Sequence, residues 1–265
     1  MEQTVQKALN LLEALVRSGQ PRRLTELSRE LGLTKPNVYR LLSTLSTLGY
    51  VKKDPQTTLY SPTLKLWEMG SMLVRDVDLV SMASPRIRRL CEETRESVQL
   101  AVFDAGFAVY VDKVDSPQPV KAMTHIGSRV PATVTSTGKA LLAWMPPIAL
   151  DQAMAHLKRY TALTIMKRRD IEIDLEEART RGYAVNRGEF RDGVAGIAAP
   201  IRDRHNQVVA AVAVWGADRS ILGPQRENLA MMAIAAARDI SRDLGHLEPA
   251  AAKARTPSSA VPEVA

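Results

Sequence analysis

The sequence contains a single cysteine, Cys91, and few aromatic residues, which make up 5% of its 265 residues. One cysteine cannot form a disulfide framework or a cysteine-based zinc site, and it is typical of a reducing compartment. Charged residues interrupt every apolar stretch before the roughly 18 residues that a membrane-spanning helix needs. The first residues, MEQTVQKALN, show no basic segment followed by an apolar one, so we expect no signal peptide. These absences predict a soluble, cytoplasmic protein without a membrane partner.

The sequence also lacks the patterns of common catalytic and metal sites. Its four histidines stand far apart and form no HxxxH or HExxH pair. There is no GxSxG nucleophile motif and no glycine-rich phosphate loop. The run Ser136-Thr137-Gly138-Lys139 suggests a hydroxyl–lysine pair, but Lys139 falls in the first turn of a predicted helix and is expected to point elsewhere. We therefore expect no enzyme activity, no catalytic residue, no metal and no cofactor.

Length and composition favour two domains with apolar cores. The chain exceeds the usual size of one domain, and 45% of its residues are hydrophobic. The patterns below predict a first domain over 1–62, a linker helix over 63–82 and a second domain over 83–246. The composition then shifts to Ala, Pro, Ser and Lys, which predicts a disordered tail over 247–265.

The net charge of +7 is concentrated in one short region. Between Arg22 and Lys53 there are seven basic and only two acidic residues, which places +5 of the chain's +7 there. No acidic residue occurs from Leu31 to Lys53. A solvated basic face and a nucleic-acid contact are both compatible with this run. The structural pattern around it decides between them.

Helical patterns surround the basic region. Apolar residues recur at helical spacing over 4–18, and a short helix opens at Arg23 or Thr25 and runs to Leu31. Gly32 permits a tight turn, and Thr34 is expected to cap a third helix that continues over 37–48. Two such helices, the second polar on its leading face, are typical of a helix-turn-helix.

Two short strands over 50–53 and 58–61, around a turn at 54–57, predict a basic wing beside the third helix. A helical bundle that binds no nucleic acid is the alternative. The third helix is expected to contact bases, while the wing holds phosphates. The expected DNA contacts are Thr34, Lys35, Asn37 and Arg40 at or near bases, Tyr39 and Ser43 toward the backbone, and Arg22, Arg23, Lys52 and Lys53 at phosphates.

A long apolar helix over 64–80 needs a partner, which is either its own sensor domain or a second subunit. The following region alternates strands and helices, as an α+β domain does, and Cys91 is expected in its core. Strands are expected over 98–104, 108–114, 120–125, 183–186, 196–202 and 207–216, and helices over 84–96, 138–144, 170–181 and 224–244.

Two polar segments of this domain are candidate ligand sites. Residues 127–139 are rich in Gly, Ser and Thr and end at a helix start, whose free N–H groups suit a carboxylate. Ser136 or Thr137 is expected to cap that helix, and simple capping is the alternative to ligand binding. The loop over 186–193, NRGEFRDG, comes directly before an apolar strand, a position that often carries function.

Two blocks of sequence in the right order resemble the IclR family of bacterial transcriptional regulators, over residues 3–245. The first is LTELSRELGLTKPNVYRLLSTLSTLGYV, and the second combines SRVPATVTSTGKALLAW with RGYAVNRGEFRDGVAGIAAPI. The resemblance implies an α+β chain with a winged helix-turn-helix, a linker helix and a GAF-like α/β effector-binding domain. It also implies operator DNA as a partner, a small carboxylate effector and self-association as a dimer or tetramer.

By the same resemblance, the expected effector-binding residues are Ala122, Val130, Ser136, Thr137, Asn186, Val194 and Gly196. Many family members carry an acid in place of Asn186, a cysteine in place of Gly196 and a serine in place of Trp215. The neutral Asn186 and the small Gly196 would admit a larger, hydroxylated ligand, whereas an inward Trp215 would narrow the pocket. We therefore expect a sugar acid or similar hydroxy acid, with an aromatic carboxylate as the alternative.

The sequence as a whole predicts a DNA-binding repressor of a carbon-catabolic operon. An effector would act by changing the spacing of two winged helices through the linker helices. The alternatives are a regulator of aromatic-acid catabolism and an architectural DNA-binding protein whose second domain only oligomerises.

Overall fold

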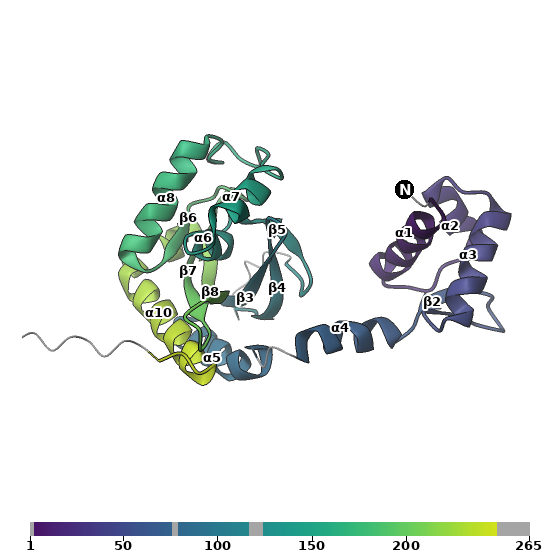
Figure 1. The fold of residues 1–265 in the computed structure, drawn as a ribbon, viewed down its shortest axis with the longest axis horizontal. Helices are drawn as coiled ribbons and strands as arrows, with labels where there is room; N and C mark the ends of the chain where they lie inside the picture. Colours follow the sequence, from purple (N-terminus) through teal and green to yellow (C-terminus); the bar gives the residue numbers. More distant parts are fainter. Residues whose placement is uncertain (1–2, 76–78, 117–123, 248–265) are drawn as a thin grey trace, which may run out of the picture. The chain divides into compact units, whose positions relative to one another are not determined.

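The computed structural model describes residues 3–75, 79–116 and 124–247, with the backbone alone for 71–75 (Figure 1). Ala122 of the expected pocket, the expected tail from residue 248 and most of the strand expected over 120–125 lie outside these ranges. The chain forms two compact units, Met1–Val77 and Asp78–Ala265. None of the helices in the described ranges is long and apolar enough to cross a membrane.

The first unit is a winged helix-turn-helix. Its elements are α1 (Gln3–Ser18), α2 (Leu24–Leu31), α3 (Lys35–Thr47), β1 (Val51–Lys53), β2 (Tyr60–Pro62) and α4 (Lys65–Arg75). The two strands of the wing pair antiparallel, with Lys53 opposite Tyr60. A bridge between Arg22 and Tyr60 ties the start of α2 to the wing. The predicted order of three helices and a hairpin is therefore confirmed.

The turn between α2 and α3 depends on Gly32. This residue ends α2 in the left-handed region, at φ 63°, which a glycine adopts without strain. Thr34 stands at the N-cap of α3 as expected, but its hydroxyl makes no capping hydrogen bond. Leu48, the last residue expected in this helix, lies one residue beyond the end of α3 and is exposed.

Several residues of the predicted apolar stripes remain on the surface of this unit. Val5, Leu9 and Val16 of α1, together with Leu64 and Trp67 beside and on α4, are each more than half exposed. The core itself is built from other residues of the same helices, including Leu11, Leu15, Leu27, Val38 and Leu42. The exposed set leaves apolar area without cover within the unit.

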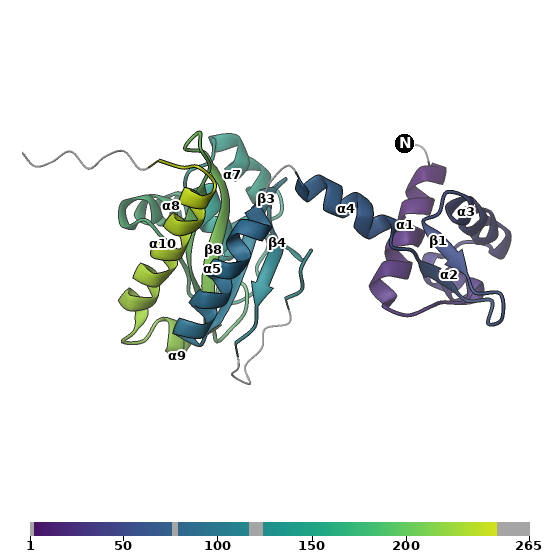
Figure 2. The ribbon, with the colours of Figure 1, turned by 90° about the horizontal axis from the view of Figure 1, so that it is seen from below.

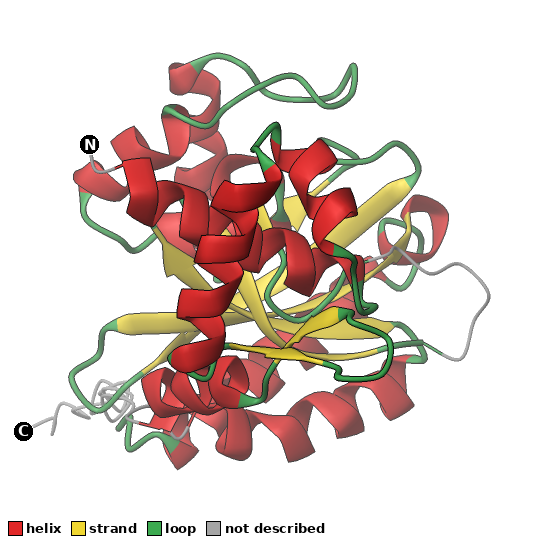
Figure 3. Ribbon diagram, turned by 90° about the vertical axis from the view of Figure 1, so that its right-hand side faces the viewer, coloured by secondary structure: helices red, strands yellow, loops and turns green. Residues whose placement is uncertain are grey.

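The second unit is built on one antiparallel sheet with the strand order β5-β4-β3-β8-β7-β6. The strands are β3 (Ser97–Asp104), β4 (Phe107–Val114), β5 (Arg129–Pro131), β6 (Ala184–Asn186), β7 (Val194–Arg202) and β8 (Val208–Ala217). Helices cover both faces of the sheet, as Figure 3 shows. This is the α/β sensor architecture that the sequence predicts.

One face of the sheet lies against α5 (Leu79–Thr94) and α10 (Arg226–Asp243), which run side by side in Figure 2. The other face lies against α6 (Ser136–Leu142), α7 (Pro147–Met154) and α8 (Arg168–Arg181). Successive strand residues point to opposite faces, so Ile197 and Val212 meet α5 and α10 whereas Ala198 and Ala211 meet the other helices. Cys91 is a buried core residue of α5, as expected.

Some predicted boundaries were wrong. Helix α5 begins at Leu79 rather than Ser84 and contains Pro85, because Leu79, Ala83 and Ile87 are buried on one face and extend the helix through the proline. The described part of the strand expected over 120–125 is not a strand, and β5, which was expected to be loop, forms one edge of the sheet, beside β4. The short elements η1 (Ala132–Val134), α7 and α9 (Asp218–Ile221) were not predicted.

Candidate functional site

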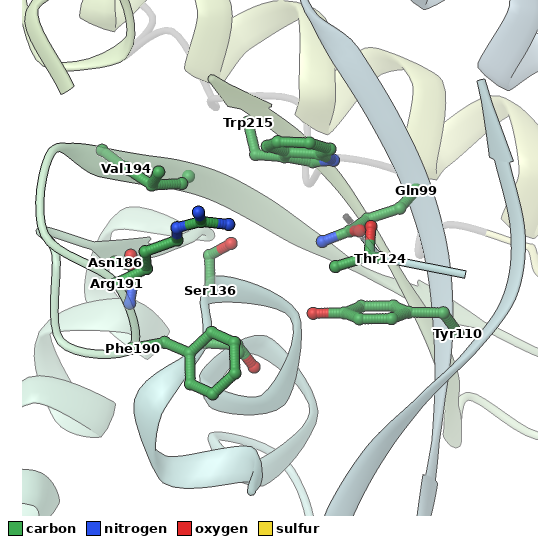
Figure 4. A pocket seen from close by; sticks show the side chains of 12 residues that line it. Gln99, Tyr110, Thr124, Ser136, Asn186, Phe190, Arg191, Val194 and Trp215 are labelled. Carbon is green, nitrogen blue, oxygen red and sulfur yellow. The ribbon is translucent and has the colours of Figure 1, made fainter. Parts of the chain in front are cut away.

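A cavity of about 100 Å³ lies on the face of the sheet that carries α6 (Figure 4). Five strands supply its floor: Gln99 from β3, Tyr110 from β4, Asn186 from β6, Gly196 from β7 and Trp215 from β8. The start of α6 closes it with Thr135 and Ser136, the loop before β7 with Phe190 and Arg191, and the first residues of β7 with Val194 and Ala195, and Thr124 completes the lining.

Four of the seven expected effector-binding residues line this cavity: Ser136, Asn186, Val194 and Gly196. Two do not. Val130 is buried in an apolar cluster with Ala101 and Ala108, and Thr137 is fully buried behind the cavity wall. The cavity also contains Gln99 and Tyr110, which sequence reasoning missed, and Phe190 and Arg191, which lie in the candidate loop over 186–193 but were not singled out. Gln99 and Tyr110 follow the ordinary alternation of β3 and β4. That pattern alone does not show which strand residue faces a ligand, and position in the loop before β7 does not show which loop residue does.

The start of α6 is capped by a different residue from those expected. Thr135 is the N-cap, and its Oγ1 accepts a hydrogen bond from the Gly138 N–H at 3.1 Å. Ser136 and Thr137 are instead the first residues of the helix. Because Thr135 satisfies the capping need, the Ser136 hydroxyl is available to the cavity that it lines.

Gly196 permits a close approach of β7 to α6 and does not enlarge the pocket. A Cβ at this position would lie 2.7 Å from Ser136 Oγ and 3.3 Å from the Cβ of Trp215. The space of the missing side chain is therefore filled by the serine. This corrects the expectation that Gly196 leaves room for a larger ligand.

Asn186 holds the loop before β7 in place. Its Nδ2 donates to the Val134 carbonyl, and its Oδ1 accepts from the Gly188 N–H at 3.3 Å. Both ends of the amide are thus engaged by the protein. The residue lines the cavity, but its polar atoms serve the loop first.

Three buried polar atoms in the cavity lack a hydrogen-bond partner among the described residues: Gln99 Oε1, Thr124 Oγ1 and Trp215 Nε1. Trp215 faces inward and is 5% exposed, which answers the question that the sequence left open. Buried polar atoms are nearly always hydrogen-bonded in folded proteins, so these three indicate a polar ligand. Burial raises the pKa of the Tyr110 phenol, which keeps its hydroxyl neutral beside them.

Arg191 supplies positive charge to this cavity. Figure 4 shows its guanidinium extending toward Ser136 and the space in front of Trp215. No Asp or Glu lines the cavity, and no ion pair joins Arg191 to a carboxylate within the described part of the chain. An arginine without a counter-ion beside a polar cavity suits a carboxylate ligand.

The loop that carries Arg191 is anchored by a buried ion-pair network. Lys139 Nζ lies 2.7 Å from Glu189 Oε1 and 2.6 Å from Asp174 Oδ2, and it donates to the Val185 carbonyl at 3.2 Å. The Lys139 side chain is 1% exposed and that of Glu189 is 3% exposed. Lys139 thus points away from the cavity, as the sequence predicted, and holds the loop between Asn186 and Arg191 against α6 and α8.

On the first unit, the residues expected at DNA bases share one exposed face of α3. Thr34, Lys35 and Arg40 are exposed, and Arg40 Nη2 donates to Asn37 Oδ1 at 2.6 Å. The other expected contacts that are exposed are Arg23, Tyr39, Ser43, Lys52 and Lys53. The helix and the wing therefore present the basic region to solvent.

Arg22 differs from the other expected phosphate contacts. It is half-buried, and its guanidinium pairs with Glu26 at 2.9 Å and with Glu30 at 3.0 Å. These carboxylates raise the pKa of Arg22, while hydrogen bonding to Arg22 lowers the pKa of Glu26. Because its charge is already paired within the unit, we expect Arg22 to hold the start of α2 against the wing rather than to contact a phosphate.

No cluster of three or more His, Cys, Asp or Glu that could hold a metal occurs among the residues with a described position.

Both units of the chain match known protein families. Residues 4–55 match the model of the IclR helix-turn-helix domain, and residues 71–242 match the model described as bacterial transcriptional regulator IclR C-terminal. The chain belongs to the IclR family of bacterial transcriptional regulators.

This IclR-family chain has curated relatives along nearly its whole length. It is 33% identical over 247 residues to the HTH-type transcriptional regulator KdgR of Escherichia coli K12, covering 92% of this chain and 93% of the relative. It is 29% identical over 248 residues to the HTH-type transcriptional repressor AllR of the same strain, covering 92% and 90%. Both relatives are named as transcriptional regulators and not as enzymes.

Solved structures agree with this assignment. The Thermotoga maritima IclR structure has a TM-score of 0.78 at 28% identity and covers 93% of this chain and all of that one. An IclR homologue from Microbacterium hydrocarbonoxydans, solved in complex with 4-hydroxybenzoate, has a TM-score of 0.79 at 22% identity and covers 91% and 98%, and its similarity supports the fold alone. The protein is therefore a DNA-binding transcriptional regulator of the IclR family, as its sequence blocks predicted.

Proposed function

We propose that this regulator is a cytoplasmic repressor of a carbon-catabolic operon, controlled by a sugar acid or a similar hydroxy acid and without enzyme activity. The observation that carries the choice of effector is the polarity of the cavity. It combines one arginine, Arg191, with three buried polar atoms that have no hydrogen-bond partner among the described residues. The relative named as a repressor supports the direction of regulation.

The ligand chemistry follows from the positions of these groups. The Arg191 guanidinium pairs with the carboxylate of the acid. Hydroxyl groups of the acid donate to Gln99 Oε1 and accept from Trp215 Nε1, and Ser136 offers a further hydroxyl at the start of α6. A purely apolar or singly polar ligand would leave these atoms unsatisfied, at a cost of about 1–3 kcal/mol each.

The size of the cavity adds one requirement. Its volume of about 100 Å³ is small beside ordinary ligand pockets, which span roughly 300–1,000 Å³. Arg191 is exposed, so its side chain is free to change rotamer on the solvent side. We expect it to rotate outward as the acid enters and then to close on the carboxylate.

On the DNA side, we propose that α3 lies in the major groove, with Thr34, Lys35, Asn37 and Arg40 at or near the bases. Tyr39, Ser43, Arg23, Lys52 and Lys53 contact the backbone in this arrangement. The exposed apolar residues on α1 and α4, among them Trp67, support self-association as a dimer or tetramer. A dimer presents two recognition helices and thereby reads a palindromic operator.

Isothermal titration calorimetry with sugar acids such as gluconate, with 4-hydroxybenzoate and with pyruvate tests the effector class. We expect the sugar acids to bind, and Arg191→Gln to weaken their binding about 10- to 100-fold, because a charge-assisted hydrogen bond contributes about 1.5–3 kcal/mol. Arg169→Gln removes an exposed arginine of α8 away from the cavity and is the matched control. Binding of pyruvate alone, or of 4-hydroxybenzoate alone, would contradict the proposed class.

A further inference from the structure

A second cavity of about 250 Å³ lies in the sensor unit, away from the candidate effector pocket. It is bounded by the end of α8, by α10, by the last residues of β7 and by Trp144, which follows α6. A Cβ added to Gly182, at the end of α8, would lie 4.0 Å from Cδ1 of Ile234 on α10. The end of α8 and α10 therefore meet here (Figure 1). The two cavities share no lining residue.

Basic groups dominate the lining of this second cavity. Arg181, Arg202, Arg238 and His246 all line it, and no Asp or Glu is among the described residues of its lining. Its other walls are apolar or small, formed by Trp144, Ala199, Pro200, Ile234 and Ala237 with Gly182 and Ser241. An anion in this cavity would be attracted by the guanidinium groups around it.

Arg202 carries the strongest argument for an anion. It donates to the Asn206 carbonyl at 3.0 Å and stacks over the Trp144 ring at 5.5 Å, but no ion pair joins it to a carboxylate in the described part of the chain. Burial lowers the pKa of the Arg202 guanidinium, which shows the cost of holding this cation without a counter-charge. The Arg202 guanidinium is therefore available to bind an anion.

Arg181 offers a second donor. Its Nε donates to the Tyr183 carbonyl at 2.7 Å, and its Nη1 lies 3.5 Å from Glu177. Its Nη2 is buried, lies 3.7 Å from Asp174 Oδ1 and makes no hydrogen bond to the described residues. Within the described part of the chain, Arg181 Nη2 therefore has an ion-pair partner in Asp174 but no hydrogen-bond acceptor.

We propose that this cavity, defined by Arg181, Arg202 and Arg238, binds a small polyanion with two or more negative charges. Such a ligand is a phosphorylated or a polycarboxylate metabolite. Planar guanidinium forks match phosphate and carboxylate oxygens in pairs, and Trp144 covers the uncharged part of the ligand. The anion supplies the counter-charge that Arg202 lacks.

The position of the site makes it a second input to the same sensor. Helix α6 begins at Ser136 in the effector pocket, and Trp144 stands two residues beyond its end, in the polyanion site. Strand β7 likewise carries Gly196 in the first cavity and Arg202 in the second. A ligand in either cavity thus contacts β7, and α6 leads from the first cavity to Trp144 in the second.

The chain contains three tryptophans, which allows each cavity to be followed separately. Replacing Trp67 and Trp215 by phenylalanine leaves Trp144 to report on the polyanion site, and replacing Trp67 and Trp144 leaves Trp215 to report on the effector pocket. Pyrophosphate and citrate are the two polyanion probes, and acetate is the singly charged control. We expect both polyanions to change the Trp144 fluorescence with a salt-dependent Kd, and acetate to have no effect at the same concentration. Tighter binding of pyrophosphate would indicate a phosphorylated ligand, and tighter binding of citrate a polycarboxylate.

In the same assay Arg202→Gln is expected to weaken polyanion binding about tenfold or more, whereas Arg169→Gln on the surface of α8 leaves it unchanged. Thermal unfolding with and without pyrophosphate provides a second measurement. The polyanion raises the Tm of the parent chain and of Arg169→Gln but not of Arg202→Gln. Equal binding by the two variants, acetate binding as tight as that of the polyanions, or a response confined to Trp215 would overturn the proposal.

Discussion

Arg22 and Arg191 show that an arginine's role depends on the carboxylates around it. Arg22 lies in the most basic part of the sequence, yet Glu26 and Glu30 neutralise it within the unit. Arg191 lies in a loop of mixed charge, yet none of the described residues that line its cavity is Asp or Glu. We therefore expect a ligand's carboxylate to pair with Arg191, and a DNA phosphate not to pair with Arg22.

The expected DNA contacts are of two kinds: residues at base edges, which determine sequence specificity, and residues at phosphates, which bind DNA of any sequence. We expect Arg40→Ala to weaken operator binding by about 1–3 kcal/mol, because a side chain at a base edge discriminates by that amount. We expect Lys52→Ala to weaken binding to operator and unrelated duplexes alike, and to reduce the slope of log K against log salt by about one. Titrations of both duplexes at several KCl concentrations measure both effects.

Lys167→Ala, which removes an exposed lysine of the sensor unit, is the control for these titrations and should leave every affinity unchanged. If Arg40→Ala left the ratio of operator to unrelated binding unaltered, Arg40 would not belong to the residues that read the sequence.

Individual pocket residues were only partly predictable from the sequence. Ser136 and Asn186 stand in polar segments with a visible pattern, and the structure places both at the cavity. Gln99 and Tyr110 lie within strands, where a polar residue that faces a cavity has the same sequence pattern as one that faces a neighbouring side chain. Gly196 was placed correctly but interpreted wrongly, because the space beside a glycine depends on what packs there, here Ser136.

At the scale of elements, the loop between β6 and β7 is the part of the sensor that most depends on buried charge. Thr161 and Thr164 donate hydroxyl hydrogen bonds to the backbone carbonyls of Gly188 and Glu189, at 2.8 and 2.7 Å. Lys139 reaches the Glu189 side chain from α6. The loop is thus fixed at its centre while Phe190 and Arg191, just beyond, line the cavity.

Removing the lysine from this network should be costly. Lys139→Met keeps a similar length but leaves Glu189 buried without its cation, beside Asp174. We expect a loss of about 3 kcal/mol in the free energy of unfolding, the usual effect of breaking one side of a buried ion pair. Urea unfolding followed by the fluorescence of Trp144 and Trp215, with Trp67 replaced by phenylalanine, measures the sensor unit.

Lys167→Met, at an exposed position, is the matched control and should change stability by less than about 0.5 kcal/mol. An equally small loss for Lys139→Met would contradict the view that the buried ion pair holds the loop.

Most helices and strands could be predicted from the sequence, because the hydrophobic periodicity of each segment and the residues at its ends indicate the same element. The winged helix, α8 and α10, and strands β3, β4, β7 and β8 were expected within a few residues of their bounds. Helix α5 was started too late, since Pro85 is a local signal whereas the burial of Leu79 and Ala83 depends on tertiary packing. Strand β5 has only three residues, Arg129–Pro131, and exists because it pairs with β4, a long-range contact that no local pattern contains.

At the scale of the whole molecule, the basic surface and the two candidate ligand cavities lie in different units. The basic α3 and wing belong to the first unit, and both cavities belong to the second. The contact-defined boundary between Val77 and Asp78 falls within the region expected to form the linker helix. Control of DNA binding by an acid then requires a coupling free energy between the units, carried through this region in a self-associated form.

A nuclease footprint on the DNA that flanks this protein's own gene, with and without sugar acids, tests the central claim most directly. We expect protection of one palindromic site, because a two-fold dimer places its recognition helices about 34–36 Å apart, or a multiple of that distance. Sugar acids should weaken this protection in the parent chain, and the same concentration should have little effect on Arg191→Gln. Protection spread without a defined site, or a defined footprint that no acid in the panel alters, would contradict the account and favour an architectural DNA-binding protein.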